Sequence, residues 1–124
     1  MYKLNLISTM VAQKLNEAIP GIPSMDRILI ASPKDVETTS SGIIIPDQVR
    51  EGVPRKGVVI KQGFISEENN SYKDQTEIGR IITYGLYAGK EIEFDLPEDL
   101  KNLDIKFSVI SLTEVIYTEP NNVD

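Results

Sequence analysis

The chain contains neither cysteine nor histidine. The absence of cysteine excludes disulfides and thiolate metal sites, and it agrees with a reducing compartment. The absence of histidine excludes a histidine general base and histidine-ligated metals, and a cysteine nucleophile is excluded as well. Only carboxylates, hydroxyls, lysine and tyrosine remain as groups for catalysis.

Long apolar runs and clusters of positive charge are also missing. The longest apolar stretch is far shorter than the roughly 20 residues that a membrane-spanning helix needs. The 13 Lys and Arg residues are outnumbered by 19 Asp and Glu residues, which gives a formal net charge of -6 without any run of cations. Such a chain repels nucleic acid and anionic lipid. We therefore expect it to bind neither nucleic acid nor membrane.

The composition that is present fits one globular domain. The chain has 124 residues, of which 40% are hydrophobic and 26% charged, so it can bury a single core. Its first 22 residues form an N-terminal extension that we predict to be helical, because apolar residues recur there at spacings of three and four until Pro20. We favour a packed or frayed terminal helix over one that binds a partner. The apolar positions are Leu4, Ile7, Val11, Leu15 and Ala18.

Beyond residue 22 the pattern changes to short runs rich in β-branched residues and separated by turn residues. Six such runs predict a small, mostly antiparallel barrel over residues 23–119, followed by a tail at 120–124. Alternation in residues 90–95 predicts that Ile92 and Phe94 face the core, and residues 97–103 read as a short helical turn. The six runs are residues 27–31, 57–61, 80–84, 90–95, 106–111 and 114–118.

Two connections are long for so small a barrel, Ser32–Lys56 and Gln62–Gly79. The first contains Ile43, Ile44 and Ile45 between polar residues. One interpretation is a seventh core strand that ends at Pro46. The other is a mobile loop, residues 34–54, that becomes ordered when the isoleucines enter a groove on a partner. Burial of three isoleucines contributes roughly 5 to 9 kcal/mol, and ordering the loop costs a similar amount, so strong binding would need several such loops on one ring.

An ordered set of short motifs resembles the GroES-type co-chaperonins, the family that caps the chaperonin folding chamber. The motifs run in order from Pro23 to Glu119, and their order is more specific than any one of them. They comprise Pro23, Asp26 and Arg27; Val36, Glu37, Thr38, Ser40 and Gly42 before the isoleucines; Gly57, Val58 and Val59; Ile78 and Gly79; Tyr87, Ala88, Gly89, Lys90, Glu91 and Ile92; and Thr113 to Ile116.

The resemblance implies a GroES-like irregular small β-barrel that assembles into a ring of seven subunits. Neighbours would pair through their first and last strands, carried over here as Ile28, Leu29 and Ile30 and as Val115, Ile116 and Tyr117. Gly42, Ile43, Ile44 and Ile45 would dock on the apical helices of a GroEL-type chaperonin. Residues 63–77 would take the place of the hairpin that roofs the dome.

The resemblance also implies how the protein works. The lid would enclose unfolded client proteins, and ATP would be bound by the partner chaperonin, so this chain itself would need no cofactor. It would act in the cytoplasm of a bacterial cell or of an infected host. Gly42 stands alone where relatives often have two glycines, Arg80 replaces the usual Asp, the connection at Leu96–Lys106 is long, and residues 1–22 have no counterpart. Such divergence would suit a virus-encoded member.

Two alternatives belong to other functional classes. The same loop could serve a small β-barrel adaptor or virion component that binds a protein other than a chaperonin. A carboxylate-based hydrolase or a hard-metal site would need acids such as Asp95, Glu98, Asp99 and Asp104 to converge, although solvated acids on a surface explain them more simply. The sequence GLYAGKE at 85–91 is one residue too short for a phosphate-binding loop. We therefore expect a lid protein that is not an enzyme, without catalytic or metal-binding residues.

Overall fold

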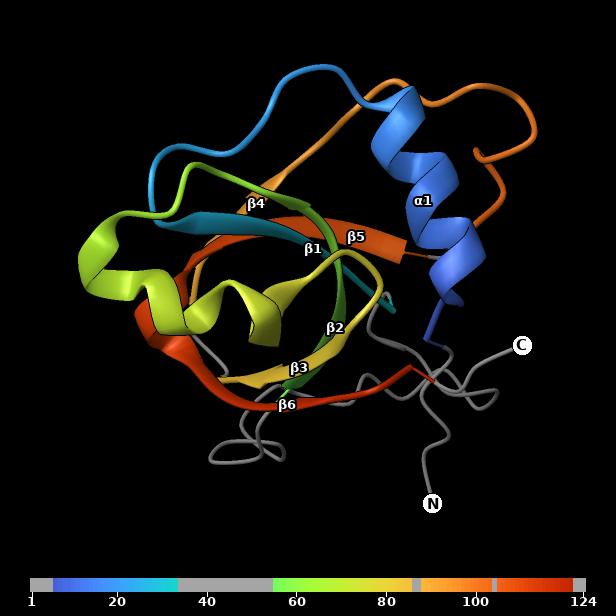
Figure 1. The fold of residues 1–124 in the computed structure, drawn as a ribbon. Helices are drawn as coiled ribbons and strands as arrows, with labels where there is room; N and C mark the ends of the chain where they lie inside the picture. The colour runs from blue at the N-terminus through green and yellow to red at the C-terminus, as the bar shows by residue number, and fades with distance from the viewer. Residues whose placement is uncertain (1–5, 34–54, 86–87, 104, 122–124) are drawn as a thin grey trace.

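Six strands form one antiparallel sheet in the computed structural model, which describes residues 6–33, 55–85, 88–103 and 105–121. The strands lie in the order β4-β5-β1-β2-β3-β6, and the sheet curls strongly (Figure 1). This confirms the prediction of a small, mainly antiparallel β fold. The strands are β1 (Arg27–Pro33), β2 (Arg55–Gln62), β3 (Ile81–Tyr84), β4 (Lys90–Ile92), β5 (Ile105–Ser111) and β6 (Val115–Glu119).

The central strands β1 and β2 are buried on both faces. Leu29 and Ala31 of β1 point into one hydrophobic cluster, and Ile28 and Ile30 point into a second cluster on the other face. All four side chains are at most 2% exposed. Continuous apolar runs are the pattern expected of strands that are covered on both sides, which explains why these runs in the sequence do not alternate with polar residues.

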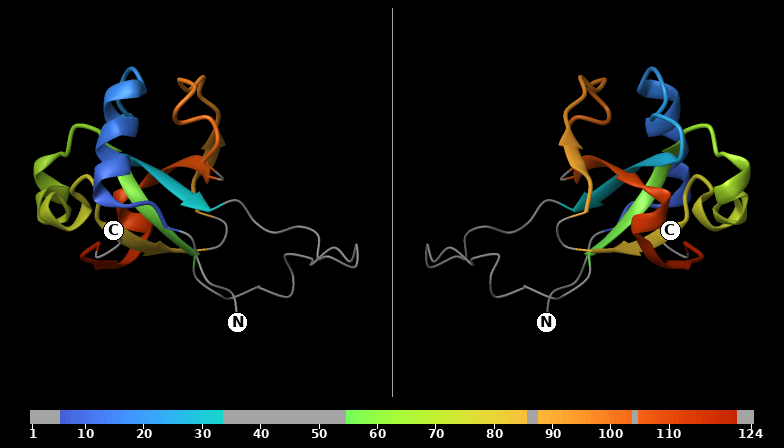
Figure 2. Two further views of the ribbon diagram at one scale, coloured as in Figure 1. Left: turned by 90° about the vertical axis from the view of Figure 1, so that its right-hand side faces the viewer. Right: turned by 90° about the vertical axis from the view of Figure 1, so that its left-hand side faces the viewer.

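Helix α1 (Thr9–Ala18) covers one face of the sheet. It begins at Ser8, whose side-chain oxygen accepts a hydrogen bond from the Val11 amide at 3.3 Å, an arrangement that satisfies one of the free amides of the first turn. Ala12 and Leu15 are completely buried in the cluster that also contains Leu29 and Ala31 of β1. Figure 2 shows the helix lying against the strands rather than extending from them. The terminal helix is therefore packed against the sheet.

The connection between β2 and β3 forms two short 3₁₀ helices, η2 (Glu67–Tyr72) and η3 (Asp74–Thr76). They lie beside the barrel at the left of Figure 1, where the resemblance had suggested a hairpin. Polar contacts hold them: the Gln62 amide nitrogen donates to the Lys73 carbonyl and to the Thr76 hydroxyl, both at 2.9 Å. A segment with little apolar surface is thus fixed by hydrogen bonds.

Residues 90–95 depart from their predicted arrangement. Strand β4 ends at Ile92, and its three residues are exposed. The Ile92 side chain is 40% exposed, so the prediction that it faces the core is wrong, because β4 is an edge strand paired only with β5. Phe94 does pack inward, and its ring meets Phe107 edge-on with centroids 5.5 Å apart.

The residues after β4 fold back over the same core face as α1. The amides of Leu100 and Lys101 both donate to the Pro97 carbonyl, which forms the helical turn predicted there. The Leu100 side chain is buried. Among the described residues no helix is long and apolar enough to cross a membrane.

Candidate functional site

The candidate binding residues Gly42, Ile43, Ile44 and Ile45 lie outside the described residues. The structure does describe the two strands to which the segment containing them is attached. Residues 34–54 connect the end of β1 to the start of β2, and these two strands pair with each other and each has a further neighbour. Both ends of the connection are therefore attached to the most deeply buried strands of the barrel. We call residues 34–54 the isoleucine segment.

Close packing fixes the strand that follows the isoleucine segment. A Cβ atom at Gly57 would lie 3.2 Å from Ile30 Cδ1 and 3.3 Å from the Ala31 carbonyl oxygen, so a side chain at this position would require its neighbours to shift by a few tenths of an ångström. Lys56 Nζ pairs with Glu119 Oε1 at 2.8 Å, which links the start of β2 to the end of β6. The base of the isoleucine segment is thereby held in a defined position.

The predicted subunit-interface residues fall in two different environments. Ile28, Leu29 and Ile30 lie in β1 between β2 and β5, and they are buried within the subunit. Both edges of this strand are therefore occupied by strands of the same chain. Ile116 and Tyr117, in contrast, lie in β6 at the edge of the sheet, and they are 64% and 61% exposed. Val115, half-buried, packs inward beside them. Pairing through β6 remains a prediction.

Asp26 is a hydrogen-bonding centre that sequence reasoning noted only as part of a motif. Its two carboxylate oxygens accept hydrogen bonds from the Ser66 amide at 2.7 Å and the Ser66 hydroxyl at 2.8 Å. Its own amide donates to the Phe64 carbonyl at 2.7 Å. The hydrogen bond from the Ser66 amide lowers the pKa of Asp26 from the usual value. The residue that precedes β1 is thus hydrogen-bonded to the segment that follows β2.

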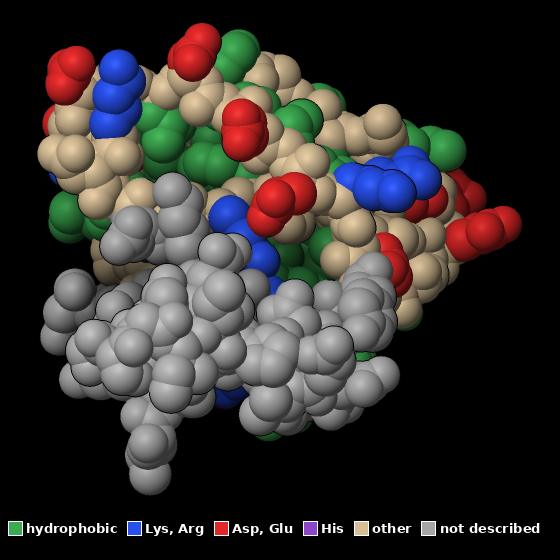
Figure 3. Space-filling model, turned by 180° about the vertical axis from the view of Figure 1, so that it is seen from behind, with side chains coloured by type: hydrophobic (Ala, Val, Ile, Leu, Met, Phe, Trp, Pro, Cys, Tyr) green, Lys and Arg blue, Asp and Glu red, His purple; other side chains and the backbone are tan. Residues whose placement is uncertain are grey.

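The acids considered for catalysis are not brought together in the part of the chain that is described. Asp95, Glu98 and Asp99 are exposed, while Asp104 lies outside the described residues. The Glu98 side chain is 94% exposed and pairs with Lys101 at 3.7 Å. Figure 3 shows acidic side chains dispersed over one face rather than gathered. No group of three or more Asp, Glu, His or Cys residues suited to a metal occurs among the described residues.

Two further residues with structural consequences had no signal in the sequence. The Asn121 side-chain amide donates to the Ile7 carbonyl at 3.0 Å and to the Gly79 carbonyl at 2.9 Å, so it ties the end of the chain to the residues before α1. Lys61 lies in β2 and is only 7% exposed. The hydrogen bonds of Asn121 join residues that are distant in the chain, and the burial of Lys61 depends on the fold around it, so no local pattern marks either residue.

The comparisons with known proteins agree with this architecture. The model of the family described as "Chaperonin 10 Kd subunit" matches residues 21–113. A co-chaperonin GroES of Thermotoga petrophila is 33% identical over 93 residues, which are 75% of this chain and 96% of that protein. A co-chaperonin GroES of Porphyromonas gingivalis is 42% identical over 76 residues, 59% of this chain and 78% of that protein. Co-chaperonin GroES 1 of Rhodopirellula baltica is 33% identical over 75 residues, which are 59% of this chain and 73% of that protein.

The family match includes β1, the isoleucine segment, β2 and the edge strand β4, whereas α1 lies outside it. The strand order and the match describe the same GroES-like small barrel. The family consists of co-chaperonins and is not a family of enzymes. The chain therefore belongs to the chaperonin 10 kDa subunit family of co-chaperonins.

Proposed function

We propose that this co-chaperonin closes the chamber of a GroEL-type chaperonin by docking Gly42, Ile43, Ile44 and Ile45 on the chaperonin's apical helices. The observation that carries the proposal is the family match across residues 21–113, which spans the isoleucine segment and the two strands that hold it. The polar flanks of this segment supply little apolar surface for a core strand of its own. A groove on a partner protein explains the three isoleucines better than a core strand does.

The proposed assembly is a ring of seven subunits in the cytoplasm. Seven subunits would present seven isoleucine segments to one chaperonin ring, and unfolded clients would be enclosed beneath them. The chaperonin would bind the ATP, and this chain would take part without a cofactor of its own. Its relatives named GroES support the chaperonin as the partner class.

The coupling between binding and release follows from the balance of two energies. Burial of three isoleucine side chains contributes roughly 5 to 9 kcal/mol, and ordering about ten residues costs at least as much, roughly 10 to 20 kcal/mol. A single segment would then bind weakly and release quickly. Several segments on one ring bind together because each docked segment raises the effective concentration of the next, and a change in the chaperonin can release all of them.

The test replaces Ile44 with Asp. A carboxylate in an apolar groove without a partner costs several kcal/mol, so we expect the ring to lose chaperonin binding by at least about a hundredfold. The matched control is Thr39→Asp, which adds the same charge in the same segment but outside the triplet. Binding would be measured with ATP present, by surface-immobilised chaperonin or by inhibition of its ATP turnover. Equal affinities for Ile44→Asp and the parent ring would contradict the docking role.

A further inference from the structure

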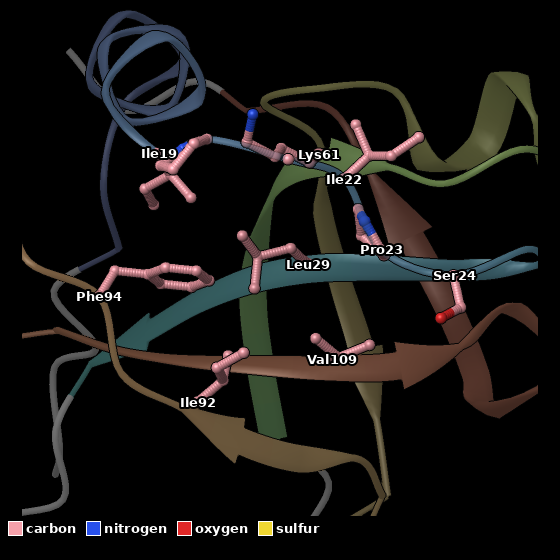
Figure 4. Close-up of a pocket in the computed structure, with 11 residues that line it drawn as sticks. Ile19, Ile22, Pro23, Ser24, Leu29, Lys61, Ile92, Phe94 and Val109 are labelled. Carbon is pink, nitrogen blue, oxygen red and sulfur yellow. The ribbon is translucent and has the colours of Figure 1, made fainter.

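The sheet face that carries Ile28 and Ile30 ends in a polar recess of about 270 Å³, which we call the barrel mouth. The opposite face of β1 and β5 has a second recess, beside the end of α1, and its walls are apolar: Leu29, Phe94 and Val109 line it (Figure 4). Mouths of β-barrels are frequent binding sites, where a few polar groups decide what binds. The polar residues that line the barrel mouth are Arg55, Tyr84, Glu91, Lys106 and Ser108.

Ser32 adds a buried hydroxyl group on the same face. It follows Ile28 and Ile30 along β1 at intervals of two residues, and it lies opposite Lys106 in the antiparallel pair of β1 and β5. Residues that lie opposite each other in such a pair project from the same face of the sheet. Ser32 is 3% exposed, and its Oγ atom has no hydrogen-bond partner among the described residues. A buried hydroxyl without a partner is rare, which indicates that this face takes up a further polar group.

The barrel mouth contains more positive than negative charge. Arg55 and Lys106 line it together with one carboxylate, Glu91, whose Oε1 atom lies 3.8 Å from Lys106 Nζ. The Glu91 side chain is 64% exposed, whereas that of Lys106 is 23% exposed. A guanidinium group has five N–H donors and an ammonium group has three, so each cation can bind a further acceptor beside the contacts that it already makes. The barrel mouth is thus locally positive in a chain whose net charge is -6.

The barrel mouth lies between the two attachments of the isoleucine segment. Ser32 and Pro33 are the last residues of β1, and Arg55 is the first residue of β2. Lys106 of β5 lies opposite Ser32. A protein that holds the isoleucine segment would therefore bring its own surface close to these residues. A side chain on that surface would reach the barrel mouth at a high effective concentration, which a free small molecule lacks.

We propose that the barrel mouth receives a carboxylate side chain of the chaperonin when the isoleucine segment docks. The inference rests on the proposed function and adds a polar contact to it. The carboxylate would accept charge-assisted hydrogen bonds from Arg55 and Lys106, and the Ser32 hydroxyl would supply a buried donor. A singly charged group fits better than a phosphate dianion, because Glu91 in the same walls repels additional negative charge. Such a contact selects an acidic docking surface over a neutral one.

Arg55→Gln and Lys106→Gln each remove one positive charge from the barrel mouth and keep a polar side chain. We expect either variant ring to bind chaperonin in the presence of ATP about tenfold more weakly than the parent at about 0.05 M KCl, and the difference to shrink at about 0.5 M KCl, because salt screens the contact. Lys101→Gln makes the same charge change at an exposed ion pair and should bind like the parent at both concentrations.

Ser32→Ala separates a role in docking from a role in folding. The substitution removes a buried hydroxyl that has no partner among the described residues, so the melting temperature of the free ring should stay the same or rise. Binding to chaperonin should nevertheless weaken severalfold, because the docked carboxylate loses a donor. The melting temperatures of Arg55→Gln and Lys106→Gln would be measured alongside, and if either is lowered, Ser32→Ala and the cross-link below carry the test.

A carbodiimide identifies the partner group directly, because it joins a carboxylate to an amine in contact with it as an amide and takes up the water that is released. Treatment of the docked complex should give a peptide that joins Lys106 to an Asp or Glu of the chaperonin, detected by mass spectrometry. The same peptide should be absent when the ring and the chaperonin are treated separately. Lys106 joined only to Glu91 or to other acids of its own ring would overturn the inference.

The binding data would overturn it as well, if Arg55→Gln and Lys106→Gln bound like the parent at low salt or lost the same factor at both salt concentrations. The Ile44→Asp ring separates this failure from a failure of the proposed function. Loss of binding in Ile44→Asp together with parent-like binding of the two Gln variants would keep the lid role and remove the contact at the barrel mouth. Weaker binding of the two Gln variants with unchanged binding of Ile44→Asp would keep the polar contact and contradict docking through the isoleucines.

Discussion

Asp26 shows how one side chain can fix a polar segment. The residue has a φ angle of 61°, in the left-handed region that Asp and Asn tolerate better than most residues. In this backbone conformation the carboxylate lies toward Ser66, and it accepts hydrogen bonds from the Ser66 amide and hydroxyl. Ser66 is the residue that precedes η2. The carboxylate therefore anchors the start of the segment between β2 and β3.

Asp26→Asn is the variant that tests this anchor, because Asn accepts the same backbone angle while it loses the charge and one acceptor oxygen. We expect faster hydrogen exchange of the Ser66 amide and a lower melting temperature, with the strands retained. Hydrogen exchange followed by mass spectrometry would measure the first effect. Asp74→Asn, an exposed acid on η3, is the control. Unchanged exchange at Ser66 would mean that the anchor is not needed.

The lowered pKa of Asp26 also predicts a pH dependence of stability. In the folded protein the hydrogen bond from the Ser66 amide holds the pKa of Asp26 below its usual value, so folding favours the charged carboxylate. The charged carboxylate contributes fully to the free energy of unfolding above the pKa of the unfolded chain. This contribution is lost as the pH falls through the pKa of the folded protein. The melting temperature of the parent should therefore drop more steeply than that of Asp26→Asn below about pH 4. Parallel acid profiles would contradict the assignment.

Helix α1 is an element that the family match does not include, and yet it completes the core. Ala12 and Leu15 have no exposed surface and belong to the cluster that contains Val58 and Ile60 of β2. Gly79 adds a second contact, since a Cβ atom there would lie 2.7 Å from Thr9 Cγ2. The extension therefore covers apolar strand residues that would otherwise face solvent.

Leu15→Ala should destabilise the subunit by about 2 to 5 kcal/mol, the range for a large buried side chain reduced to Ala. Met10→Ala on the same helix should change stability by less than about 0.5 kcal/mol, because its side chain is 67% exposed. Urea unfolding at one fixed protein concentration measures both, since assembly itself adds stability. Similar losses for both variants, or none for Leu15→Ala, would show that the helix is not part of the cooperative core.

The elements differ in how far the sequence predicts them, for physical reasons. The strands were predictable because β-branched runs between turn residues have a local signature, and α1 because its apolar period is regular. The two 3₁₀ helices were not, since they depend on distant groups: Thr118 donates its hydroxyl to the Gln75 carbonyl across 43 residues. The edge position of Ile92 depends on strand order, which no local pattern contains.

The residues considered for binding also differ in how far the sequence alone can place them. Ile43, Ile44 and Ile45 could be proposed as a binding site from composition and from the resemblance, because an apolar triplet between polar residues is a local feature, and they stay a prediction. The placement of Ile28, Leu29 and Ile30 required the strand order, although their continuous apolar run is itself typical of a strand buried on both faces. Lys61 gave no signal, since a lysine in a strand usually lies in solvent.

At the scale of the whole molecule, we propose separate tasks for the barrel and the isoleucine segment. Lys56 and Glu119 tie β2 to β6, so the strand that follows the isoleucine segment is linked to the edge strand of the sheet. A fixed spacing between segments is what multivalent binding needs, because affinity is gained only when several sites can be engaged at once. Assembly and docking should consequently be separable by mutation but coupled in affinity.

Rings assembled from mixtures of parent and Ile44→Asp subunits test that coupling. If each segment adds about 1.4 kcal/mol to docking, each replaced segment weakens binding about tenfold, and the logarithm of the dissociation constant should rise steadily with the fraction of variant subunits. Mixtures with Thr39→Asp should show no such slope. Binding that stays constant until nearly all subunits are replaced would mean that one segment is sufficient. The barrel would then have no need to hold neighbouring isoleucine segments at a set distance.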